Sequence, residues 1–203
     1  MNIVDVGYDS TNYYVLGPDR ARLLIDVGMP GTFPRLLANL RWKDVPLASV
    51  RCLLATHYHP DHAGIAQELK RAGVRLIVLD VQRPAVTALN AFMQRRGPCA
   101  EITHHDNVDL RIDESRAFLA QLGIAGQIVA TPGHSDDSVT LVLDDGAAFT
   151  GDLTPPGFAP DASRAAVDLS WRKLRELGVT WLYPGHGPAR SVPDPDQSQR
   201  RRT

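Results

Sequence analysis

Short apolar segments alternate along the chain with longer amphipathic ones, and turns rich in glycine, proline and aspartate separate them. Apolar runs bounded by such turns predict β-strands. The predicted strands cover residues 2–6, 12–16, 22–26, 50–55, 74–79, 108–112, 127–130, 138–143, 147–150 and 180–183. Apolar residues spaced three and four apart predict helices over residues 32–40, 61–72, 84–96, 115–122 and 162–177. Because both kinds of element recur in both halves, the pattern predicts a layered α/β protein.

The size and composition of the chain favour a single folded domain. Its 203 residues, of which 43% are hydrophobic and 22% charged, suit a globular protein with one sizeable core. We expect this domain to cover residues 1–190. Residues 191–203 are polar, contain prolines and carry three consecutive arginines near the end. This composition predicts a frayed, solvated C-terminal tail.

Net charge and cysteine content indicate which macromolecular partners and which disulfides to expect. The formal net charge of −1 gives no general attraction to nucleic acid or to an anionic membrane, so neither is expected as a partner. Cys52 and Cys99 form no C-x-x-C pair and no disulfide framework. Without a long apolar run or a secretion signal, the sequence predicts a cytoplasmic protein. The oligomeric state stays open, with a homodimer as one alternative.

Four side chains that bind metals well gather directly after the fourth predicted strand. They are His57, His59, Asp61 and His62. Side chains alternate along an extended segment, so His57 and His59 point to the same side. Pro60 suits the first turn of a helix, from which Asp61 and His62 project back toward the strand end. Imidazoles and a carboxylate in this proximity favour zinc or a similar divalent ion.

Three further short motifs each follow a predicted strand. Thr-Pro-Gly-His ends at His134, Thr-Gly-Asp ends at Asp152, and Tyr-Pro-Gly-His-Gly-Pro contains His186. The glycines beside each polar residue allow tight turns at a strand end. A histidine in a glycine- and proline-containing loop is, taken alone, typical of the surface. Together the four motifs offer seven ligands, more than one tetrahedral ion needs, which predicts a two-metal site.

The motifs T-H-Y-H-P-D-H-A-G, T-P-G-H-S, T-G-D and Y-P-G-H-G-P, in this order, resemble those of the metallo-β-lactamase superfamily. The resemblance spans about residues 2–190. It implies a four-layer αβ/βα sandwich, with two sheets face to face, helices outside and the metals at one edge. It also implies that the first metal is bound by His57, His59 and His134. The second would be bound by Asp61, His62 and His186, with Asp152 bridging the two.

The aspartate of the T-G-D motif points to one branch of this superfamily. Asp152 resembles the bridging aspartate of hydroxyacylglutathione hydrolases (glyoxalase II) and their relatives, which true β-lactamases typically lack. Too few residues follow His186 for the helical C-terminal region that carries much of the glutathione site in that enzyme. Glutathione thioesters are therefore one candidate substrate among several.

The resemblance implies a metal-dependent hydrolase with a small-molecule substrate. Two divalent ions lower the pKa of a shared water toward about 7. The resulting metal-bridging hydroxide would cleave a small thioester, ester or lactone, with Asp61 and Asp152 as the catalytic carboxylates. Zinc is the expected metal, with iron and manganese as alternatives. Competing hypotheses are a persulfide dioxygenase-like mononuclear iron oxidoreductase, a β-lactamase-type hydrolase, a nuclease and a non-enzymatic metal-binding module.

Four other residues near the motifs allow two interpretations each. Tyr58 either donates a hydrogen bond to substrate or packs beneath the metals. Asp137 orients a ligand or, as the stronger expectation, caps a turn. His104 and His105 are expected in a polar loop rather than at the mouth of the site. Substrate specificity is expected to depend on loops within residues 7–12, 97–107 and 154–161.

Overall fold

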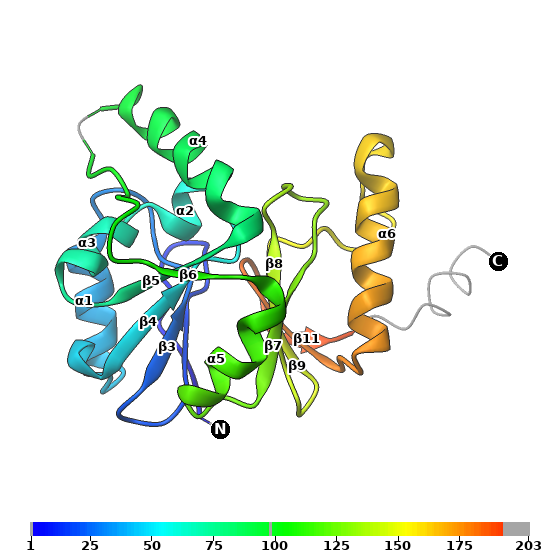
Figure 1. Cartoon of the computed structure of the whole chain (residues 1–203), viewed down its shortest axis with the longest axis horizontal. Helices are drawn as coiled ribbons and strands as arrows, with labels where there is room; N and C mark the ends of the chain where they lie inside the picture. Colours follow the sequence, from blue (N-terminus) through cyan, green and yellow to red (C-terminus); the bar gives the residue numbers. More distant parts are fainter. Residues whose placement is uncertain (1, 98, 193–203) are drawn as a thin grey trace.

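Two β-sheets pack face to face in the computed structural model, which describes residues 2–97 and 99–192 (Figure 1). The first sheet contains β1 (Ile3–Asp5), β2 (Tyr14–Leu16), β3 (Arg22–Ile25), β4 (Val50–Leu54), β5 (Arg75–Leu79) and β6 (Val108–Leu110), in that spatial order. The second contains β7 (Gly126–Ala130), β8 (Val139–Leu143), β9 (Ala147–Gly151), β10 (Trp181–Pro184) and β11 (Arg190–Ser191), in the order β11-β10-β9-β8-β7.

Helices cover the outer faces of both sheets. The α-helices are α1 (Phe33–Trp42), α2 (Pro60–Ala63), α3 (Ala66–Arg71), α4 (Arg83–Gln94), α5 (Ser115–Gln121) and α6 (Asp161–Glu176). Short 3₁₀ turns are η1 (Leu47–Ser49), η2 (Asp80–Gln82) and η3 (Ile112–Glu114). In Figure 1, α1 and α3 flank the first sheet, α6 covers the second, and α5 packs beside β7. The predicted αβ/βα sandwich is confirmed.

The continuous apolar runs of the central strands arise because both faces of each strand are buried. In β4, Cys52 and Leu54 point into the core between the two sheets, whereas Leu53 packs on the helix side. In β5, Ile77 likewise points into the core between the sheets, and Val78 packs on the helix side. A strand buried on both faces needs apolar residues at every position, which hides the two-residue period in the sequence.

The strand directions bring the four motifs to one edge of the sandwich. Strands β9 and β10 are parallel neighbours, so their carboxyl ends meet at the same edge. Strand β7 is antiparallel to β8, and β8 is antiparallel to β9, so β7 ends at that edge too. Strand β4 lies between parallel neighbours in the facing sheet and delivers the first histidine motif. This arrangement places the ends of distant sequence segments within reach of one another.

Two predicted elements differ from the structure. The single helix expected over residues 61–72 is wrong, since α2 ends at Ala63 and α3 begins at Ala66. The carbonyl of His62, which would accept the next bond of a continuous helix, instead accepts the N–H of Val27 at 2.9 Å. The unpredicted strand β11 pairs with β10 at the start of the predicted tail. Residues 193–203 of that tail lie outside the described residues.

Among the residues that the structure describes, no helix is both long and apolar enough to cross a lipid bilayer.

Candidate metal centre

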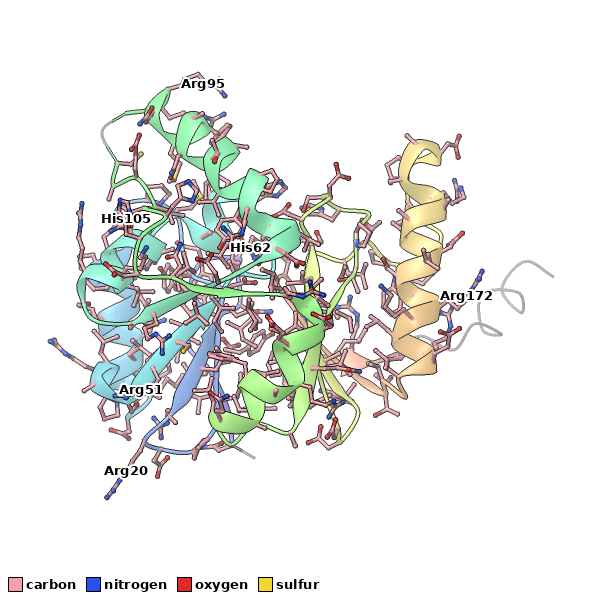
Figure 2. The ribbon with its side chains drawn as sticks, viewed as in Figure 1. Arg20, Arg51, His62, Arg95, His105 and Arg172 are labelled. Carbon is pink, nitrogen blue, oxygen red and sulfur yellow. The ribbon has the colours of Figure 1, made fainter. Side chains whose placement is uncertain are left out.

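The structure brings all seven predicted ligands together at the shared edge of the sheets. Their donor atoms form three overlapping groups, each within 4.8 Å: His57, His59 and His134; His57, His62 and Asp152; Asp61, His62 and His186. Figure 2 shows His62 near the middle of the molecule, between the two halves of the sandwich. The first two groups share His57, and the last two share His62, so the three form one continuous cluster.

The spacing of the donor atoms suits ligands around an ion. Nε2 of His186 lies 3.3 Å from Oδ2 of Asp61 and 3.4 Å from Oδ2 of Asp152. Nε2 of His62 lies 3.5 Å from Oδ2 of Asp61 and 3.4 Å from Oδ1 of Asp152. Two donors, each about 2.0–2.2 Å from a tetrahedral ion, are separated by about 3.4 Å. The cluster therefore has the dimensions of a coordination shell.

Several donor atoms of the cluster are buried without a hydrogen-bond partner among the described residues. They are Nε2 of His57, Nε2 of His62 and Oδ1 of Asp152. A buried polar group without a partner costs roughly 1–3 kcal/mol, so such groups in a folded protein require an explanation. Metal coordination satisfies all three at once, and the nitrogen and carboxylate donors fit zinc or iron.

Hydrogen bonds to the other ring nitrogens orient the histidines. His62 Nδ1 lies 2.9 Å from Oδ2 of Asp26, and His186 Nδ1 lies 2.6 Å from the carbonyl oxygen of Ser10. In both, a proton on Nδ1 leaves the Nε2 lone pair free for a metal. His59 differs, because its Nδ1 faces Nε2 of His134 at 3.1 Å. His59 therefore presents Nδ1 to the cluster.

The protein groups alone shift the pKa values of the two buried imidazoles in opposite directions. Burial, reinforced by the neighbouring histidines, lowers the pKa of His57 to about 2, so this ring is neutral and available to a metal. Burial also disfavours the charged form of His62, but Asp26 and Asp152 outweigh it and raise its pKa to about 12. A metal at Nε2 of His62 would therefore compete with a proton for that atom.

Asp26 contacts the cluster, and the sequence interpretation missed it. Its side chain is 2% exposed and accepts hydrogen bonds from the backbone N–H and the hydroxyl of Thr56, at 2.6 and 2.8 Å, besides contacting His62. Its backbone φ of 58° is the left-handed conformation that Asp and Asn tolerate best. An acidic residue closing an apolar strand was the available signal.

Asp137 anchors the backbone of the first histidine motif from the facing sheet. Its Oδ2 accepts the N–H of Tyr58 at 2.7 Å, between two candidate ligands, and its side chain is buried. The fully buried Gln82 joins the same region by donating to the carbonyls of Ala55 and Asp137, at 3.0 and 3.2 Å. The ligand-orienting interpretation of Asp137 therefore fits better than the turn-capping one.

Close packing at the strand ends explains one glycine of the motifs. A Cβ on Gly185 would lie 2.5 Å from Oδ1 of Asp152 and 2.6 Å from Cε1 of His62. Any larger residue would push apart two members of the cluster. The glycine before His186 is therefore required by the approach of the backbone to the ligands.

His104 and His105 do not join the cluster. Both are exposed, and the carbonyl of His105 accepts a hydrogen bond of 2.6 Å from Lys70. Figure 2 places His105 on the outer side of the molecule, away from His62. This agrees with the polar loop expected for them.

Two cavities are lined in part by the candidate ligands. One, of about 510 Å³, is lined by Tyr58, His59, Pro60, Asp61, Ala88, Leu89, Phe92 and Arg95. The other, of about 300 Å³, is lined by His134, Gly151, Asp152, Leu153, Thr154, Pro155, Pro184, His186 and Arg190. The candidate metal ligands thus border two spaces that a substrate can enter. Fold and site together define a metal-binding αβ/βα sandwich with its ligands at the strand ends.

Comparison with known proteins places this class of protein in a family. A family model described as the metallo-beta-lactamase superfamily matches residues 6–186. The chain belongs to this superfamily, which confirms the resemblance seen in its motifs.

The relatives within the superfamily differ in their names. The chain is 28% identical over 184 residues to "Beta-lactamase-like protein 2 homolog" of Drosophila melanogaster, a match that covers 87% of this chain and 58% of that protein. It is 31% identical over 185 residues to "Atrochrysone carboxyl ACP thioesterase" of Aspergillus fumigatus, covering 87% and 50%. The chain spans about half the length of the curated relatives it matches.

A solved structure covers the chain almost completely. TTHA1623 in a di-iron-bound form is 25% identical, with a TM-score of 0.69 and coverage of 95% of each chain.

Proposed function

We propose that this chain is a binuclear metal-dependent hydrolase that cleaves a small thioester, ester or lactone. The observation that carries the proposal is the position of the Asp152 carboxylate between the groups of candidate ligands. Its Oδ2 lies 3.6 Å from Nε2 of His134 and 3.4 Å from Nε2 of His186, while its Oδ1 lies 3.4 Å from Nε2 of His62. A carboxylate within reach of both groups has the placement of a ligand shared by two ions.

The assignment of ligands follows the three groups. His57, His59 and His134 would hold one ion, Asp61, His62 and His186 the other, and Asp152 would bridge them. Two divalent ions held there would supply an acidified water and a Lewis acid that polarises the substrate carbonyl. Zinc suits this donor set, and iron is supported by the di-iron form of TTHA1623. Manganese is the further alternative.

The protein side chains control the geometry of the reaction. Asp152 would fix the spacing of the site, because its two oxygens face different histidines. Asp61 is 31% exposed beside the cluster, and the hydroxyl of Thr11 donates to its Oδ2 at 3.3 Å. Asp61 would accept a hydrogen bond from the attacking water and orient it toward the carbonyl.

The similarity to an acyl carrier protein thioesterase supports a thioester among the three substrate classes. Hydrolysis of a thioester releases a carboxylic acid and a thiol and needs no redox partner. Names containing "lactamase-like" among the relatives keep β-lactams in the panel of substrates that tests the proposal.

Metal analysis coupled to a substrate panel tests this function. We expect about two ions per chain after loading with zinc or iron, and turnover of a thioester, ester or lactone that a chelator abolishes. A plateau at one ion with iron-dependent oxygen consumption would instead favour the mononuclear oxidoreductase. Full metal loading without turnover on any substrate would contradict the hydrolase assignment.

A further inference from the structure

The larger of the two cavities extends the site along α4. Its wall combines candidate ligands His59 and Asp61 with the exposed side of α4 around Ala88 and Phe92. At about 510 Å³ it falls within the roughly 300–1,000 Å³ typical of small-molecule sites. A molecule in this cavity would lie directly beside the metal cluster.

A further cavity adjoins the cavity of about 510 Å³. It has about 240 Å³ and is lined by Met29, Pro30, Pro60, Phe92, Met93, Arg96, Gly97 and Cys99. Pro60 and Phe92 line both cavities, so the two adjoin. We call them together the α4 cleft. Most of its lining is apolar, which favours an apolar ligand group over a charged one.

The wall of the α4 cleft includes the buried side chain of Tyr58. The Tyr58 side chain is 4% exposed, and its hydroxyl finds no hydrogen-bond partner among the described residues.

Arg95 and Arg96, just after α4, contribute the two basic side chains that line the cleft. Arg95 follows the last residue of α4, and Figure 2 shows it at the tip of that helix, well away from His62. The guanidinium of Arg96 lies 4.3 Å from the centre of the Phe92 ring, which fixes that ring as part of the wall. The cleft thus runs from the candidate metals, past apolar residues, to a cationic rim.

We propose that the α4 cleft binds the acyl group of the substrate, with the scissile carbonyl at the cluster and a medium-length apolar chain along Ala88 and Phe92. This inference rests on the proposed hydrolysis and specifies its substrate class. The cavity of about 300 Å³ that is lined by Asp152, Thr154 and Arg190 then receives the leaving group. Acyl thioesters with several methylenes are better substrates than acetyl thioesters.

One substitution fills the cleft without touching a candidate ligand. Ala88 is exposed on α4 and lines the cleft, so Ala88→Trp places a large ring in it while leaving the helix core unchanged. Ala91 lies on the same helix, is also exposed and lines neither cavity, so Ala91→Trp is the matched control. The probes are octanoyl and acetyl thioesters of the same thiol.

We expect Ala88→Trp to lower the octanoyl-to-acetyl ratio of kcat/KM by about tenfold or more at unchanged metal content. Ala91→Trp should keep the wild-type ratio. An unchanged ratio in Ala88→Trp at equal metal content would overturn the proposal, and so would an equal fall in both variants.

Binding of octanoate, measured by titration calorimetry, separates this inference from the proposed hydrolysis. If metal-loaded wild type turns over neither thioester, the hydrolase assignment for this substrate class fails. Octanoate binding that Ala88→Trp weakens and Ala91→Trp retains would still support the apolar cleft. Wild type that neither binds octanoate nor prefers the octanoyl thioester would overturn the cleft itself.

Discussion

The two sheets deliver their ligands to the metal centre in different ways. From the first sheet come His57 and His62, whose side chains are 1% and 0% exposed. From the second sheet come His134 and His186, which are 29% and 41% exposed and follow glycines in loops. The buried half of the site is therefore His57 and His62, and the exposed half contains His134, His186 and also His59 of the first motif.

The buried half holds its ligands in a preorganised geometry, whereas the exposed half gives ions and substrate access to the site. Core residues support the buried half, because Asp26 contacts His62 and Thr56 simultaneously. Such support fixes ligand direction before any ion arrives, at the cost of burying polar atoms. The exposed half leaves room for ions and substrate to enter. Metal binding should then raise the stability of the whole domain, since it pairs the buried donors.

The largest effect is expected at Asp152, which joins the two halves. Asp152→Ala removes the shared carboxylate, so we expect weaker metal binding and a loss of turnover by orders of magnitude, equivalent to several kcal/mol of transition-state stabilisation. Metal content, turnover and melting temperature are measured beside Asp136→Ala, an exposed aspartate of a neighbouring loop. Full metal content and normal turnover in Asp152→Ala, with only a lower melting temperature, would make the residue structural.

A smaller effect, confined to the buried half, is expected for Asp26→Asn. Asparagine tolerates the φ of 58° and can still accept the Thr56 N–H, but its NH₂ group would face Nδ1–H of His62. The imidazole must then change its tautomer and protonate Nε2, the atom that faces the cluster. We expect metal affinity to fall about 10–100-fold, as for other groups that orient metal ligands.

Asp106→Asn is the control for that experiment. Asp106 is exposed and has the same backbone φ of 58°, so the control isolates the contact with His62 from any effect on the backbone. Competition with a chromogenic chelator measures the affinity of each variant. Equal affinities in the two variants would show that Asp26 does not orient His62.

The sequence predicted the site well because its metal-binding residues directly follow predicted strands. All seven predicted ligands converge because each follows a strand whose carboxyl end lies at one edge. The position of Asp26 at the site could not be predicted from the sequence, because it depends on the pairing of β3 with β4, which places Asp26 beside Thr56. The break between α2 and α3 was hidden for a similar reason, since Val27 takes the carbonyl that would extend the helix. Pairing between distant segments has no local signal.

The smallest effect is expected at Asp137, which ties the facing sheet to the buried half. Its carboxylate accepts the Tyr58 N–H from a loop between β7 and β8, so Asp137→Ala leaves a buried backbone donor unpaired. This loss costs about 1–3 kcal/mol and should lower the melting temperature by about 2–4 °C for each kcal/mol. Metal content at saturation should stay near wild type, because no proposed ligand is removed.

Asp136→Ala, one residue away and exposed, should leave the melting temperature unchanged. If both variants melt like wild type, the bond to Tyr58 contributes nothing to stability. If instead Asp137→Ala loses metal as severely as Asp152→Ala, then the buried half is not preorganised by its own core, and the contrast between the two halves fails.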